Sequence, residues 1–200
     1  MILKLYKEQT SHRDLNKVCS VLHSDGVVIY PTDSVYALGC AINSPKGVDK
    51  LRKLTGKDIK EFSIIFNDIS TMAEYCRIDN ATFKILKRNM PCAITFILRA
   101  SSRIPDRIIG KRKTIGARIP DNSIVRAMVD ALGVPMLTTS LKSDYDYDEY
   151  LTDPELINEK WGDKVDLVID GGIGYITPTT VVDLSDGEVE IIREGEAELL

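Results

Sequence analysis

The fold is decided by one stretch, Gly26-Val27-Val28-Ile29-Tyr30-Pro31-Thr32-Asp33-Ser34-Val35-Tyr36-Ala37-Leu38-Gly39-Cys40. Its apolar run at residues 27–30 predicts a buried strand, which ends at Pro31 because proline cannot donate to a sheet ladder. Several hydroxyls and a carboxylate follow. Such residues are typical both of ligand-binding strand ends and of ordinary turns, and the pattern alone leaves both interpretations open.

The chain has 200 residues, a hydrophobic fraction of 44% and a net charge of −4. By length it would suit one globular domain or two small ones, and it can bury a substantial core. No apolar run approaches the ~20 residues of a membrane span, and the N-terminus lacks the pattern of a signal peptide. We therefore expect a cytoplasmic protein that makes no use of a membrane.

Cysteine and histidine are too few and too scattered for several kinds of chemistry. No CxxC pair occurs, and the only histidines, His12 and His23, fall in the first predicted helix. The sequence therefore predicts no zinc site, and it supplies a Ser-His-Asp or Cys-His catalytic set poorly.

Helices and strands alternate along the chain until a hairpin closes it. Capping residues predict helices that begin near Ser11, Ser44, Asp79, Asn122 or Ser123, and Asp153. Strands are expected at residues 26–30, 62–66, 93–98, 114–120, 135–140 and 165–169, and the hairpin at 179–184 and 188–193. A glycine inside the 114–120 strand predicts a bulge or a close backbone approach. With no linker in sight, this order indicates one α/β domain with a mixed sheet over residues 1–200.

Basic residues are concentrated in two runs, at 46–60 and 99–118. Such runs are usually solvated faces, and this interpretation is favoured here. Two of them in a mildly acidic protein can also mark a cleft for phosphates.

Several segments, in chain order, resemble motifs of the YrdC-like family, which includes the TsaC enzymes and the YciO proteins. They are residues 31–39, 91–98, 114–121, 139–140, 170–172, 178–183 and 193–195. The resemblance covers about residues 15–195. It implies an α/β (α+β) fold in which a twisted mixed sheet, flanked by helices, surrounds a concave basic cleft.

The resemblance also implies an activity, that of an L-threonylcarbamoyladenylate synthase. Such an enzyme makes threonylcarbamoyl-AMP from L-threonine, bicarbonate and ATP for the t6A modification of tRNA. It is a nucleotidyltransferase that takes ATP as substrate with Mg²⁺, and it needs no tightly bound metal. The protein's work in this reaction is positioning and charge neutralisation, so no catalytic residue is assigned.

The resemblance carries over to individual positions. Thr32 and Tyr36 are expected to hold the threonine or its carbamate, whereas Asp33 is interpreted mainly as a turn carboxylate. A buried arginine needs an anionic partner, which favours a ligand contact for Arg118. Seven residues are expected to contact the nucleotide or its phosphates: Lys53, Lys57, Arg118, Ser140, Lys142, Thr180 and Arg193.

Departures from the family motifs indicate the YciO branch. The family's KxR motif reads Thr55-Gly56-Lys57, and Lys57 lacks the planar fork that suits bidentate phosphate contact. Lys53 is a candidate substitute one turn earlier. Lys142 replaces an asparagine, and Phe66 stands where a histidine often occurs.

Alternatives to the synthase therefore remain open. One is a diverged paralogue that binds double-stranded RNA, tRNA or nucleotide in the same cleft, with little or no synthase activity; RNA binding would then be steeply salt-dependent. Another is adenylate chemistry on a different amine, suggested by Phe66, and the last is a purely structural domain. Aromatic residues are not interleaved with the basic ones, so a base-stacking platform is not evident.

Overall fold

The computed structural model describes residues 1–5, 10–58, 61–111, 113–142 and 149–200. Its strands join in one mixed sheet of order β1-β9-β2-β3-β8-β4-β7-β6-β10-β11, with β5 paired to β6. Their bounds are β1 (Ile2–Lys4), β2 (Val28–Tyr30), β3 (Ala37–Ala41), β4 (Ser63–Ile65), β5 (Cys76–Arg77), β6 (Ile94–Ala100), β7 (Thr114–Arg118), β8 (Met136–Ser140), β9 (Leu167–Asp170), β10 (Thr180–Asp183) and β11 (Glu190–Arg193). The expected mixed α/β architecture is confirmed.

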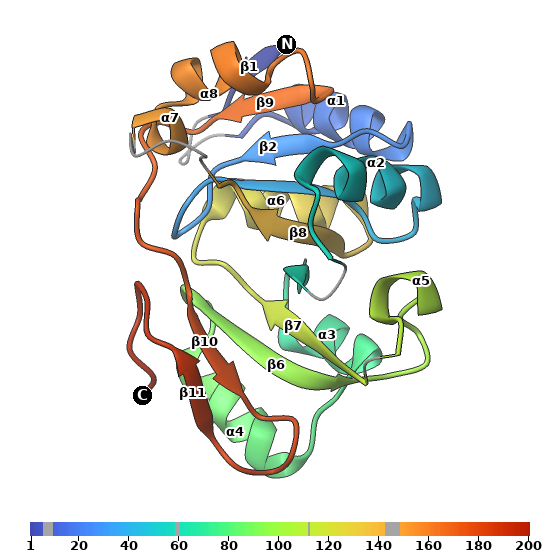
Figure 1. Ribbon diagram of the computed structural model, residues 1–200, viewed down its shortest axis with the longest axis vertical. Helices are drawn as coiled ribbons and strands as arrows, with labels where there is room; N and C mark the ends of the chain where they lie inside the picture. The colour runs from blue at the N-terminus through green and yellow to red at the C-terminus, as the bar shows by residue number, and fades with distance from the viewer. Residues whose placement is uncertain (6–9, 59–60, 112, 143–148) are drawn as a thin grey trace.

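The sheet combines parallel and antiparallel pairs of strands. Strand β9 is parallel to β1 and β2, β4 is parallel to β7, and β6 is parallel to β10. Strands β10 and β11 form the expected antiparallel hairpin, with an irregularity in register at residues 181–182. In Figure 1 the strands twist from β1 near the N-terminus down to β11.

Strand β3 was missed by sequence reasoning, which treated the segment after Pro31 as a turn. All five of its residues are buried, and it pairs antiparallel with both β2 and β8. Its sequence, Ala-Leu-Gly-Cys-Ala, contains no β-branched residue and therefore gives little local signal for a strand. Strands β1 and β5 were missed as well.

The predicted helices are present, and their caps form as expected. They are α1 (His12–His23), α2 (Pro45–Thr55), α4 (Asn80–Asn89), α6 (Ser123–Leu132) and α8 (Pro154–Trp161). The Ser11 and Ser44 hydroxyls accept backbone N–H groups three residues on, as do the Asp79 and Asn122 side chains. Sequence reasoning missed α3 (Ile69–Tyr75), α5 (Asp106–Ile109) and α7 (Glu149–Thr152).

Within the described ranges, no helix is long and apolar enough to cross a membrane.

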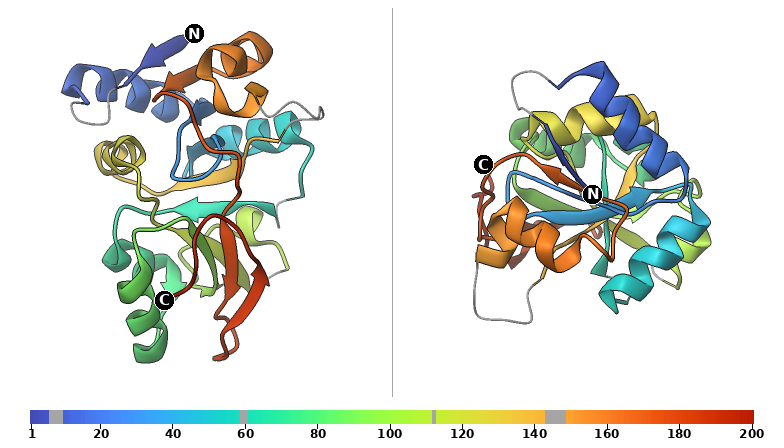
Figure 2. Two further views of the ribbon diagram at one scale, coloured as in Figure 1. Left: turned by 90° about the vertical axis from the view of Figure 1, so that its left-hand side faces the viewer. Right: turned by 90° about the horizontal axis from the view of Figure 1, so that it is seen from above.

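Two hydrophobic clusters hold the helices to the sheet. One lies under α1 and α6, where Leu22 and Met128 pack with Val28 of β2. The other contains Leu51 of α2 and Leu86 of α4. Figure 2 (left) shows α1, α6, α3 and α4 along one side of the sheet. In Figure 1, α3 and α4 lie behind the lower strands, and α2 lies in front of the upper ones. Among the described elements, none of the helices lies in front of the lower strands in Figure 1.

Candidate functional site

A cleft of about 550 Å³ opens on the sheet, and seven adjacent strands contribute to its lining: β3, β8, β4, β7, β6, β10 and β11. Along β6 and β7, the alternation of side chains decides which residues face the cleft. Thr95 and Ile97 of β6 line the cleft, whereas Phe96 between them is fully buried. Likewise, Gly116 and Arg118 of β7 line the cleft while Ala117 packs in the core.

Gly116 shapes the floor of the cleft. A Cβ atom added at this position would lie 2.5 Å from Ser63 Oγ and 2.9 Å from Thr95 Cγ2. The glycine expected from the sequence to mark a close approach therefore does so, and it leaves space at the bottom of the cleft.

Among the described lining residues, four are cationic, and they come from distant parts of the chain: Lys57, Arg118, Lys142 and Arg193. Glu61 is the only carboxylate among the described lining residues. The basic cleft expected from the resemblance is thus present in the structure, although binding of a nucleotide by these residues remains a prediction.

Lys57 reaches the cleft because α2 ends just before it. Gly56 adopts a left-handed conformation, with φ of 61°, and stops the helix. The Lys57 ammonium then donates hydrogen bonds to Thr139 Oγ1 at 2.7 Å and to the Ser140 carbonyl at 2.9 Å. Burial, and to a smaller extent the charge of Lys142, lower the pKa of Lys57 to about 8. This cation is therefore partly deprotonated in mildly alkaline solution.

Arg118 already has an anionic partner inside the protein. Its Nη2 lies 2.6 Å from Asp33 Oδ1, and only 6% and 9% of the two side chains are exposed. The other Asp33 oxygen accepts the backbone N–H of Asp121 at 2.7 Å. Asp33 therefore does more than form a turn. Its carboxylate neutralises the charge of Arg118, the residue that the sequence led us to expect in contact with a phosphate group. Arg118 Nε is buried without a partner among the described residues.

Lys142 and Arg193 present charge nearer the rim. The Lys142 amine lies 3.9 Å from Glu61, and the two side chains are 69% and 42% exposed. Arg193 donates from Nε and Nη2 to the carbonyl of Thr179, at 3.1 and 2.6 Å. A carbonyl does not neutralise the guanidinium, so Arg193 keeps its positive charge available to a ligand.

A cluster of hydroxyls in the cleft was missed by sequence reasoning, apart from Ser140. It consists of Ser63, Thr95, Thr138, Thr139 and Thr179 together with Ser140. Thr95 and Thr179 join β6 to the start of β10 through their hydroxyls, 3.0 Å apart. The available signal was the presence of hydroxyl residues, such as Thr95, Thr139 and Thr179, inside the segments that resemble family motifs.

Thr180 does not reach the cleft, contrary to the expectation from the sequence. Strand alternation directs Thr179 and Val181 to the cleft and Thr180 to the other side. There its hydroxyl donates to the Ala197 carbonyl and accepts the Gly195 N–H at 3.0 Å. Thr180 therefore anchors the C-terminal segment.

Thr32 and Tyr36 use their hydroxyls within the protein and do not line the cleft. The Thr32 hydroxyl donates to the Val35 carbonyl at 2.8 Å and accepts the Ser34 N–H at 3.0 Å. The Tyr36 hydroxyl donates to the Gly172 carbonyl at 2.7 Å. Burial raises its pKa. These side chains fix the loops around the cleft, while Val35 of the same segment lines it.

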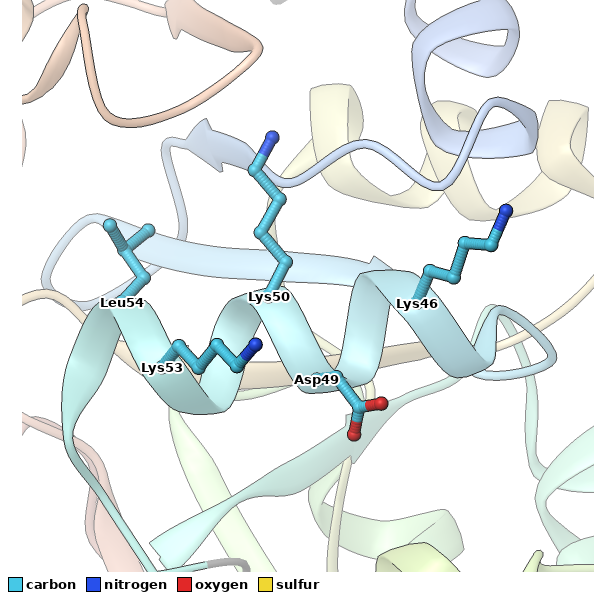
Figure 3. A pocket seen from close by; sticks show the side chains of 5 residues that line it. All are labelled: Lys46, Asp49, Lys50, Lys53 and Leu54. Atoms are coloured by element: carbon cyan, nitrogen blue, oxygen red, sulfur yellow. The ribbon is translucent and has the colours of Figure 1, made fainter.

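Lys53 also lies outside the cleft, because it faces away from the buried side of α2. Figure 3 shows Lys46, Lys50 and Lys53 around an open depression on this helix. Phe66, the position that suggested a different amine, is fully buried against Tyr75, with ring centroids 5.7 Å apart. Its side chain therefore belongs to the core and gives no evidence about substrate choice.

Both basic runs are partly neutralised by acidic residues of the same chain. In the first run, Lys46 lies 3.9 Å from Asp25 and Lys50 lies 2.5 Å from Asp166. In the second, Arg99 pairs with Asp186 and Arg103 with Glu74, each at 2.8 Å. These pairs weaken the field that the runs present to a phosphate backbone.

The described part of the chain contains no group of three or more His, Cys, Asp or Glu side chains placed to hold a metal ion.

The chain belongs to the Sua5/YciO/YrdC family. Residues 20–195 match the family Sua5_yciO_yrdC, described as "Telomere recombination". The chain is 38% identical to the "Uncharacterized protein YciO" of Escherichia coli K12 over 194 residues, which are 96% of this chain and 93% of that protein. The crystal structure of E. coli YciO matches with a TM-score of 0.90 and 35% identity, covering 99% of this chain and 97% of that one. The resemblance to YciO proteins is thereby confirmed.

Relatives with other names match as well. The chain is 30% identical to a Methanocaldococcus jannaschii protein named "Putative threonylcarbamoyl-AMP synthase", over 97% of this chain and 92% of that protein. The structure of Pyrococcus abyssi Sua5 complexed with L-threonine matches with a TM-score of 0.87 and 22% identity, covering 98% of this chain and 57% of that one. At this identity the likeness shows the shared fold.

Proposed function

We propose that this protein is a nucleotidyltransferase of the threonylcarbamoyl-AMP synthase type, acting on L-threonine, bicarbonate and ATP. The observation that carries the proposal is the convergence of four cations and a set of hydroxyls in one cleft on the sheet. The relationship to the M. jannaschii protein supports the choice of reaction. A reaction that consumes ATP also fits the cytoplasmic location expected from the sequence.

In the proposed reaction, the amine of threonine and bicarbonate give a carbamate and water. A carbamate oxygen then attacks the α-phosphorus of ATP, and pyrophosphate leaves. Charge accumulates on the phosphate oxygens, so fixed cations stabilise the transition state more than the separated substrates. Lys57, Lys142 and Arg193 are placed to supply that charge, with Mg²⁺ accompanying the triphosphate.

The hydroxyls suit the amino-acid part of the reaction. Thr95, Thr139 and Thr179 can each donate to a carboxylate or accept from an amine. The P. abyssi Sua5 complex with L-threonine supports an amino-acid ligand for this fold. Arg118 contributes less net charge because Asp33 balances it, so we assign Arg118 chiefly to fixing the cleft wall.

The test is pyrophosphate release by variants with matched controls. Lys142→Ala and Arg193→Ala should each lower kcat/KM by about ten- to a hundredfold, the effect expected for one charge-assisted hydrogen bond. Lys53→Ala removes a cation of the same kind outside the cleft and should change kcat/KM less than about twofold. Equal loss in all three variants would reject the cleft as the site.

One set of observations favours a second candidate, a paralogue that binds nucleotide with little synthase activity. Lys57 replaces a family arginine and has a lowered pKa, and Arg118 is balanced by Asp33. Two of the four cations are therefore weakened. If the protein binds ATP but forms no threonylcarbamoyl-AMP, the result would favour this second candidate. Binding of tRNA or double-stranded RNA is less well supported, since both basic runs are partly ion-paired.

A further inference from the structure

The Lys57 amine has unusual surroundings for a lysine in a basic cleft. Its two hydrogen-bond acceptors, the Thr139 hydroxyl and the Ser140 carbonyl, are both neutral. Within the part of the chain that the structure describes, no carboxylate lies within ion-pairing distance of it. A neutral amine has two N–H groups to donate, so these two acceptors satisfy it and leave its lone pair unused.

The charged groups around Lys57 favour an anion at this place. Lys142, which follows β8, repels the ammonium, and Glu61, which precedes β4, attracts it less strongly. Across the cleft, Arg193 of β11 is cationic, and Arg118 of β7 is balanced by Asp33. An excess of positive charge therefore disfavours a further cation and stabilises a negative group.

We propose that Lys57 is a carbamylation site, at which its Nζ reacts reversibly with CO2. The lone pair of the neutral amine forms a bond to the carbon of CO2, one C=O π bond becomes the carboxylate, and the nitrogen loses one proton to solvent. The products are a lysine carbamate and H⁺, with no change of oxidation state. The open cleft gives CO2 access to the nitrogen.

The neutral amine needed for this step is available near neutral pH. The pKa of Lys57 is about 8, in the range of α-amino groups, so roughly a tenth of it is neutral at pH 7. The carbamate would place its carboxylate near the Lys142 ammonium and the Thr139 hydroxyl. Carbamylation would replace a cation by an anion in the cleft, so dissolved CO2 would weaken the binding of phosphates.

The experiment incubates the full chain with ¹³C-labelled bicarbonate near pH 8, traps carbamates with a trialkyloxonium salt and locates the label by peptide mass spectrometry. We expect label on Lys57 in the wild-type protein and none at this position in Lys57→Arg, whose guanidinium does not deprotonate. Lys53→Arg is the matched control, and in this variant Lys57 should still carry the label. An unlabelled Lys57 peptide in the folded wild-type protein would overturn the proposal.

A second variant tests the role of the neighbouring cation. Lys142→Gln removes both the repulsion that lowers the pKa of Lys57 and the charge that stabilises the carbamate, so trapping should fall at least severalfold. Unchanged trapping would contradict the electrostatic argument. Since the trapping needs neither ATP nor threonine, its outcome is independent of synthase activity.

Discussion

The carboxylate of Asp33 lies 2.6 Å from the guanidinium of Arg118, and both side chains are buried. The two residues are 85 positions apart in the sequence. Their pairing fixes the loop after β2 to the strand that forms the cleft floor. Removing one partner of a buried pair leaves an uncompensated charge, which is far more costly than losing an exposed pair.

Asp33→Ala should therefore lower the free energy of unfolding by about 3 kcal/mol or more. Urea denaturation followed by circular dichroism measures this change. Asp186→Ala, which breaks the exposed pair with Arg99, is the matched control and should cost less than about 1 kcal/mol. Similar costs for the two variants would show that the Asp33 pair is not buried in solution.

Thr179 and Thr180 provide a test of the alternation along β10. Thr180→Val removes the hydroxyl that joins the Ala197 carbonyl to the Gly195 N–H, and should lower the free energy of unfolding by about 1–3 kcal/mol. Thr179→Val removes a hydroxyl from the cleft and should weaken substrate binding more than Thr180→Val does. Calorimetric titration and thermal unfolding of both variants measure the two effects. If Thr180→Val weakened substrate binding and Thr179→Val mainly lowered stability, the side chain of Thr180, and not that of Thr179, would face the cleft.

Lys57 should make anion binding depend on pH. Because its pKa is lowered to about 8, the ammonium predominates at pH 7 and is largely lost at pH 9. The affinity for ATP should fall as pH rises through this range, as measured by calorimetric titration. In Lys57→Arg the charge persists and this decrease should disappear. A decrease of the same size in the variant would assign the titration to another group.

Gly116→Ala should fill the floor of the cleft. The new Cβ would clash with Ser63 Oγ, so we expect a loss of about 1–3 kcal/mol in stability together with weaker ligand binding. Ser63→Ala in the same chain removes the closer of the two clashing atoms, but not Thr95 Cγ2, and should restore part of the stability. Thermal unfolding of the single and double variants measures the rescue. Full stability of Gly116→Ala alone would contradict the close approach.

Local signals were sufficient for most of the fold. Ser11, Ser44 and Asp79 begin helices where their side chains can cap them, and Gly133 ends α6 in a left-handed conformation. Strand β3 could not be predicted in this way. Its small residues are buried because β2 and β8 lie on either side of it, and that pairing with β8 is a long-range property.

The candidate site was only partly predictable for a similar reason. Lys57, Ser140, Lys142 and Arg193 do line the cleft. A sequence motif locates a segment but does not show which of two adjacent side chains points into the cleft, so it indicates Thr180 as readily as Thr179. The ion pair of Arg118 with Asp33 could not be predicted either, because the two residues are far apart in the sequence and no local pattern relates them.

The most direct test of the proposed function is to incubate the protein with ATP, Mg²⁺, bicarbonate and L-threonine and to analyse the products by mass spectrometry. We predict threonylcarbamoyl-AMP and an equal amount of pyrophosphate, both dependent on threonine and both strongly reduced in Arg193→Ala. ATP bound by the folded protein with neither product formed would contradict the synthase assignment and favour the nucleotide-binding paralogue.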